Sequence, residues 1–165
     1  MSNQTMELSR TQMENMVAQA QSALQMYDKI VEIEERMNQT ALRTEIRLDK
    51  IENSYPLLDT EADRIQSMAM IKARQFTKQL FAQEVSQELF SKKFGHIISG
   101  VYRAIKNQFH VRKYTLVKHV DAEKAVAFVE QLKLTDLPPR FLRLTDHQID
   151  VAERHGDFEI LKRLG

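Results

Sequence analysis

Two rows of apolar side chains recur every seven residues over about residues 6–54. One row begins at Met6 and the other at Met16, and the rows lie three or four positions apart, which is the spacing of a coiled-coil seam. Further apolar residues widen the seam on both sides: Val17, Leu24, Val31, Met26 and Ile33. A wide seam favours a bundle of more than two helices, or packing on the rest of the chain, over a two-stranded zipper.

A helix of this length would extend roughly 70 Å, because each residue adds 1.5 Å. We therefore expect residues 1–55 to form an arm through which copies of the chain associate. The alternative is that the arm folds back as one half of an intramolecular hairpin. The seam residues expected to carry self-association are Met16, Ala23, Tyr27, Ile30, Met37, Leu48 and Ile51.

Residues 56–165 are expected to form a small helical domain. Pro56 closes the first helix, because the residue before a proline is disfavoured in helical conformation. Apolar residues at helical spacing predict a second helix over about 60–90, and Gly95 marks a break before a third apolar stripe that runs from Ile97 to Phe109.

The remaining segments are shorter. Residues 110–120 are rich in β-branched and aromatic side chains, which favours one short strand or an extended turn. Asp121 is expected to cap the helix that carries Phe128, and we expect Phe109 and Phe128 to be buried against each other. Thr145 and Gln148 have the spacing of a capping box before a short helix, and Asp157 is expected to cap a last turn, which ends at Leu164.

The chain has only four glycines and three prolines, and the first glycine is Gly95. Such a sequence cannot supply the turns of a β-sandwich or the glycine-rich loops of a nucleotide-binding fold. The pattern therefore predicts an all-α protein with at most one short β element: a long coiled-coil-like N-terminal helix followed by a small helical C-terminal domain.

The net charge of +1 conceals an uneven distribution of charged residues. Residues 1–55 carry six basic and nine acidic residues, whereas residues 91–135 carry nine basic and three acidic ones. Within the basic segment 91–120 there is no acidic residue at all. Its seven cations are the candidates for nucleic-acid binding, since phosphate backbones attract such surfaces: Lys92, Lys93, Arg103, Lys106, Arg112, Lys113 and Lys118.

Catalytic and cofactor motifs are missing from the sequence. There is no cysteine, and Gly95 and Gly100 have phosphate-loop spacing but are followed by Val101 and Tyr102 where that loop needs Lys and Ser or Thr. The five histidines form no metal-ligand pattern. We expect no enzyme activity, no cofactor and no metal site.

Residues 97–129 resemble the C-terminal domain of phage antirepressors, the ORF-six C-terminal domain family. The residues that carry the resemblance are Val101-Tyr102-Arg103, Ile105-Lys106, Phe109, Val111, Tyr114 and Phe128. One departure is His110, which stands where a small turn residue often follows the phenylalanine. A second is the N-terminal arm, which stands where the family usually has a DNA-binding domain. The resemblance implies regulation in a phage or mobile element and binding to DNA.

Together these observations predict a non-enzymatic regulatory protein that binds nucleic acid, with DNA preferred, through its basic 91–118 surface as a homo-oligomer. The alternative is an antirepressor-like interaction module that binds a repressor protein and not DNA. No apolar stretch is long enough to cross a membrane, and no secretory-signal pattern is present, so we expect a cytoplasmic location without a membrane partner.

Overall fold

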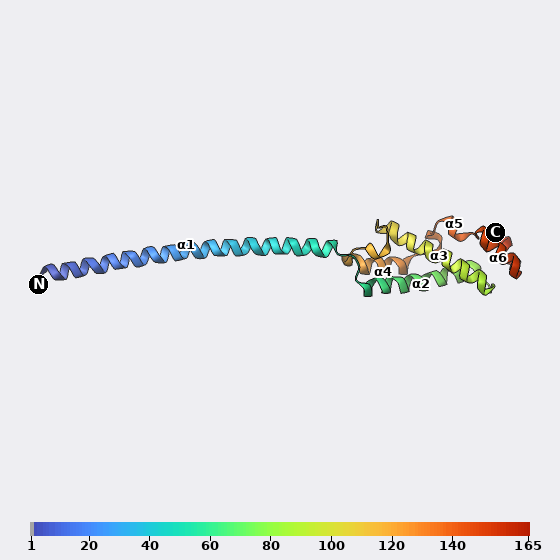
Figure 1. Cartoon of the computed structure of the whole chain (residues 1–165), viewed down its shortest axis with the longest axis horizontal. Helices are drawn as coiled ribbons and strands as arrows, with labels where there is room; N and C mark the ends of the chain where they lie inside the picture. The colour runs from blue at the N-terminus through green and yellow to red at the C-terminus, as the bar shows by residue number, and fades with distance from the viewer. Residues whose placement is uncertain (1) are drawn as a thin grey trace. The chain divides into compact units, whose positions relative to one another are not determined.

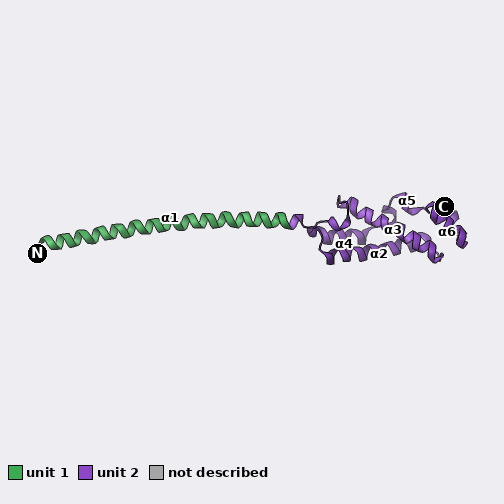
Figure 2. Cartoon of the chain, viewed as in Figure 1, with its two compact units in different colours: residues 1–51 green, residues 52–165 purple. Residues whose placement is uncertain are grey.

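The computed structural model describes residues 2–165 and is all-α over that range, with no β-strand (Figure 1). The chain divides into two compact units, residues 1–51 and residues 52–165 (Figure 2). The α-helices are α1 (Ser2–Ser54), α2 (Asp59–Phe81), α3 (Gln87–Gln108), α4 (Ala122–Gln131), α5 (Pro139–Leu142), α6 (Asp146–His155) and α7 (Phe158–Leu164). The short 3₁₀ helices are η1 (Tyr114–Leu116), η2 (His119–Asp121) and η3 (Leu134–Asp136).

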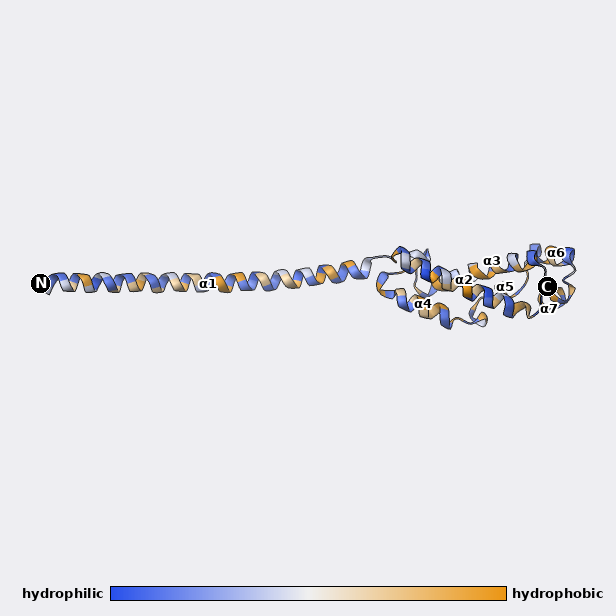
Figure 3. Cartoon of the chain, turned by 90° about the horizontal axis from the view of Figure 1, so that it is seen from below, coloured by the Kyte–Doolittle hydropathy of each residue, from blue (hydrophilic) through white to orange (hydrophobic). Residues whose placement is uncertain are grey.

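The predicted N-terminal helix is confirmed as α1, an uninterrupted helix of 53 residues. It contains no glycine or proline, and exposed ion pairs one turn apart, such as Arg10–Glu14 and Arg36–Glu32, add modest support. None of its described residues is buried, and apolar residues recur along its whole length (Figure 3). Helix α1 therefore leaves its apolar seam accessible to a partner.

The main core of the second unit lies between α2, α3 and α4. Helix α2 packs against both of the others, and its alanines Ala69 and Ala73 are fully buried at this junction. Small side chains let the helix axes approach closely, and larger residues such as Ile97 and Ile105 on α3 fill the space between them. The core forms because each helix buries one apolar stripe.

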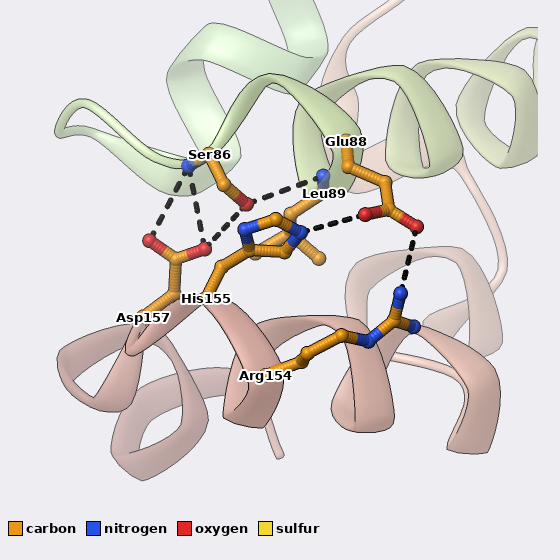
Figure 4. Close-up of polar contacts among 6 residues, drawn as sticks. All are labelled: Ser86, Glu88, Leu89, Arg154, His155 and Asp157. Carbon is orange, nitrogen blue, oxygen red and sulfur yellow. Dashed lines mark hydrogen bonds and ion pairs between the residues drawn. The ribbon is translucent and has the colours of Figure 1, made fainter.

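A second core joins the end of α2 and the start of α3 to α6 and α7. Its fully or almost fully buried residues are Phe81, Leu89, Val151, Ala152 and Ile160. Polar residues also connect the start of α3 to α6 and to the residue before α7 (Figure 4). The hydroxyl of Ser86 donates to the carboxylate of Asp157 at 2.7 Å, and Nε2 of His155 lies 2.6 Å from the carboxylate of Glu88. The C-terminal helices are thus fastened to the first turn of α3.

The expected single helix over residues 60–90 is wrong, because two helices occupy this segment. Helix α2 ends at Phe81, and Ala82 adopts the left-handed conformation with φ of 56°, where its N–H bonds to the carbonyl of Lys78. Helix α3 starts anew after Ser86, whose side chain accepts a hydrogen bond from the N–H of Leu89. The apolar spacing continues across the turn because residues on both sides of the turn pack into the second core.

The expected break at Gly95 is also wrong, since α3 runs through this residue without interruption. The buried stripe of Leu89, Ile97, Val101 and Ile105 holds the helix on both sides of the glycine. Tertiary packing therefore outweighs the low helix propensity of one glycine.

Residues 110–120 form no strand but two 3₁₀ turns and an isolated antiparallel bridge between Pro56 and Lys118. The N–H of Leu57 donates to the carbonyl of Val117 at 2.9 Å in this bridge. Phe109 and Phe128 meet edge to face, with ring centroids 6.2 Å apart, but both are half-buried instead of fully buried. Their predicted contact is confirmed and their complete burial is not.

The predicted helix starts near the C-terminus are confirmed in position. Thr145 and Gln148 form the capping box of α6, and Asp121 and Asp157 precede α4 and α7. Neither aspartate makes a capping hydrogen bond with its side chain. Over the residues described, no helix combines the length and the apolar character needed to cross a bilayer.

Candidate nucleic-acid interface

Helix α3 carries a polar stripe opposite its buried stripe. Lys92, Ser99 and Lys106 lie seven residues apart, and Gly95 and Arg103 fall between them at helical spacing, so all five share one face. Lys92, Gly95, Ser99 and Arg103 are exposed, and Lys106 is half-buried. We call these residues the α3 stripe.

The α3 stripe ends in an open hollow that three cations share. Ser99, Arg103, Lys106, Asn107, Val111 and Arg112 line this hollow. Among residues 2–165, none of Arg103, Lys106 and Arg112 forms an ion pair with a carboxylate. Their positive charges are therefore available to an anionic partner.

The turn after α3 brings Arg112 back to the end of the helix. His110 has a positive φ of 54°, a conformation that favours glycine, and the N–H of Val111 donates to the carbonyl of Lys106 at 3.0 Å. A glycine would adopt this conformation at lower cost than His110. Lys113 and Lys118 follow on the same connection and are both exposed.

The two tyrosines near the interface stack on each other. The rings of Tyr102 and Tyr114 lie 4.9 Å apart with an angle of 22° between their planes, and both residues are half-buried. Burial raises the pKa of the Tyr102 hydroxyl, and the neighbouring Tyr114 raises it to a smaller extent. Since each ring already has a stacking partner, the structure favours a packing role for Tyr102 over stacking on a nucleobase.

Lys93 does not belong to the surface, which corrects its assignment as a nucleic-acid contact. Its side chain is fully buried, and Nζ donates to the carbonyl of Arg143 at 2.5 Å and lies 3.3 Å from Nδ1 of His96. Burial lowers the pKa of Lys93 from 10.5 to about 8. The sequence held a sign of this, because Lys93 lies four residues from both Leu89 and Ile97 on the apolar stripe.

We expect Lys93→Met to raise the free energy of unfolding at pH 7 by about 1–2 kcal/mol. The amino group of Lys93 binds its proton less tightly in the folded state than in the unfolded chain. The charged lysine therefore destabilises the fold most below pH 8, and this destabilisation disappears as the pH rises from about 8 to 10.5. The pKa shift of Lys93 is equivalent to about 3 kcal/mol of destabilisation at pH 7. The methionine variant recovers only part of this free energy, because it also loses the hydrogen bond to the carbonyl of Arg143.

Urea unfolding at pH 7 and pH 10 measures this difference, and the advantage of the methionine variant should shrink at the higher pH. Lys92→Met is the matched control, because its side chain is exposed and the substitution should change stability by less than about 0.5 kcal/mol. A gain of stability that is equal at both pH values would contradict the buried-charge interpretation.

Gly95 and Gly100 occupy α3 for different reasons. A Cβ added at Gly95 would meet no atom within 4 Å, so packing inside the protein does not require a glycine there. A Cβ at Gly100 would lie 3.0–3.2 Å from the ring of Phe141, so this glycine makes room for α5. Gly95 therefore leaves the backbone of the α3 stripe open to solvent at a cost in helix stability.

Gly95→Ala is expected to stabilise the fold by about 0.5–1 kcal/mol, since alanine is the better helix former. Gly100→Ala is expected to destabilise it by about 1–2 kcal/mol, because crowding of Phe141 exceeds the gain in helix propensity. Thermal unfolding of the two variants makes the comparison, and a common direction of change would contradict the assignment.

The seven candidate residues for self-association all lie on α1 and are all exposed. Tyr27, Ile30 and Met37 are 65%, 57% and 66% exposed, which is far more than these side chains show in a packed core. Among the described residues, no group of three or more acidic or histidine side chains is arranged to hold a metal ion.

The family model of the ORF6C domain matches residues 15–138 of the 165. The chain belongs to the ORF6C domain family. The matched region of this ORF6C chain includes most of α1 and all of α2, α3 and α4, and so extends well beyond the resemblance seen at residues 97–129. Membership is consistent with a phage-type regulatory module. No curated protein and no solved structure matches the chain.

Proposed function

We propose that this ORF6C-family protein is a non-enzymatic phage or mobile-element regulator that binds duplex DNA through the α3 stripe and the basic connection after it. The observation that carries the proposal is the set of exposed or half-buried cations on and beside one helix, without an acidic residue between positions 91 and 120. Six of the seven candidate cations remain in this set after Lys93 is removed.

The dimensions of the α3 stripe suit the major groove of B-DNA. From Lys92 to Lys106 the stripe extends roughly 21 Å along the helix, because each residue adds 1.5 Å. A groove about 12 Å wide admits an α-helix, whereas the deep and narrow major groove of A-form RNA does not. The absence of a side chain at Gly95 and the small side chain of Ser99 would allow close approach to the duplex.

The cations would divide into two roles. Lys92, Arg103 and Lys106 are expected to contact phosphates and so to position the protein without reading sequence. Arg112 and Lys113 follow the helix at a turn, so one of them is the better candidate for a base contact, since an arginine can bind guanine with two hydrogen bonds. Lys118, further along the connection, would add a phosphate contact.

Self-association through the seam of α1 completes the proposal, because several copies would present several α3 stripes to one duplex. A second candidate, consistent with an ORF6C domain, is an antirepressor-like module that binds a repressor protein and not DNA.

Binding to duplex DNA and RNA, measured across salt concentrations together with the mass in solution, tests the proposal. We expect DNA binding that weakens as the salt concentration rises. If four phosphates are contacted, the slope of log affinity against log salt should be about −3.6 per protomer. Absence of DNA binding at low salt would refute the proposal. Co-elution with a repressor at high salt would then favour the second candidate.

A further inference from the structure

The outer surface of α2 carries an apolar groove that is separate from the α3 stripe. Two open hollows meet at Lys78: one includes Met70, Ile71 and Arg74, and the other includes Val85 and Phe90. We call this surface the α2 groove. Met70 and Ile71 are 42% and 54% exposed, although most other apolar residues of α2 are covered by α3 and α4.

Two cations stand over this apolar surface. Arg74 and Lys78 are one helical turn apart, and within the described part of the chain neither forms an ion pair. Glu84, at the far end, is the acidic residue that lines the groove. An occupant should therefore combine apolar side chains with carboxylates.

Helix α1 has a face with this chemistry. Leu24, Asp28, Val31 and Glu35 follow each other at intervals of four, three and four residues, so they share one side of the helix. Leu24 is 64% exposed and Val31 37% exposed, and neither Asp28 nor Glu35 forms an ion pair among residues 2–165. This acidic face flanks the heptad seam and does not coincide with it.

We propose that the α2 groove of one copy of this chain binds the acidic face of α1 from a second copy. Leu24 and Val31 cover the exposed Met70 and Ile71, and Asp28 and Glu35 lie near Arg74 and Lys78. Such a contact removes apolar surface from water on both partners, and the opposite charges fix its register. It also accounts for the width of the seam, because one side of the stripe then packs on α2 of a neighbour while the seam packs on other copies of α1.

The test uses the full-length chain in an Ile30→Lys background, in which association through the seam is weakened. Arg74→Glu combined with Lys78→Glu should weaken the remaining self-association at low salt by about tenfold, since two exposed opposite-charge pairs become repulsive. Adding Asp28→Lys and Glu35→Lys to the same chain should restore the association. Sedimentation equilibrium over a range of protein concentrations measures both effects.

Lys133→Glu with Lys162→Glu is the matched control, because it makes the same change in net charge at exposed residues that line neither the α2 groove nor the α3 stripe, and it should leave self-association unchanged. An equal loss in this control, or a failure of the reciprocal swap to restore association, would overturn the proposal. A change in sedimentation that is independent of concentration would place α1 of the same chain in the groove and would also overturn it. DNA affinity of the groove variants should not change, so failure of this inference and failure of DNA binding are distinguishable.

Discussion

Arg103→Glu combined with Lys106→Glu is expected to lower affinity for duplex DNA on the order of 100-fold at 0.1 M salt, whatever the sequence of the duplex. Each lost phosphate contact removes about one released counterion, which corresponds to roughly eightfold in affinity at this salt concentration, and the new carboxylates add repulsion. The salt slope should fall from about −3.6 to about −1.8 per protomer. Fluorescence anisotropy with two unrelated duplexes, measured over a range of salt, gives both quantities.

Lys133→Glu with Lys162→Glu is the control for this experiment, since both residues are exposed and lie outside the α3 stripe. The thermal unfolding temperature of the Arg103 and Lys106 variant should stay close to that of the parent, because neither side chain belongs to the core. Unchanged DNA affinity in this variant would contradict DNA binding through the α3 stripe and would favour the binding of a repressor protein as the function.

Ile30→Lys should weaken self-association by several kcal/mol, on the order of 1,000-fold in the dissociation constant. Ile30 lies in the middle of the heptad seam, and a lysine there brings a charge into each copy's contact surface unless its long side chain reaches solvent. The parent chain should sediment as a dimer or larger species, and the variant should dissociate at micromolar concentration. Circular dichroism of the variant would also show whether α1 remains helical without its partner.

Gln39→Lys provides the matched substitution on the opposite side of α1, nine residues from Ile30, where a charge should have little effect. A monomeric mass for the parent chain at micromolar concentration would contradict self-association through the seam.

The helices that could be predicted from the sequence are those in which local signals and packing agree. The heptad rows and Pro56 predict α1, and the capping box of Thr145 and Gln148 predicts the start of α6. The turn between α2 and α3 could not be predicted from apolar spacing, because Phe81 and Leu89 pack into the same core from two different helices. Ser86 was the available sign of a new helix start.

The candidate site could be predicted as a region but not residue by residue. A run of seven cations without an acid identifies the surface, yet it does not separate exposed residues from Lys93, whose position on the apolar stripe of α3 decides its burial. The placement of Arg112 beside the end of α3 depends on the left-handed conformation of His110. A histidine at this position does not predict that conformation.

The contact between Ser86 and Asp157 joins the part of the chain that the family model matches to the part beyond it. The family match ends at residue 138, but the start of α3 is held by residues of α6 and α7 that lie beyond this limit. Leu89 and Phe81 are likewise covered from that side. We therefore expect a chain that ends at residue 138 to be less stable than one that includes α6 and α7, because these helices cover the first turns of α3, where the α3 stripe begins.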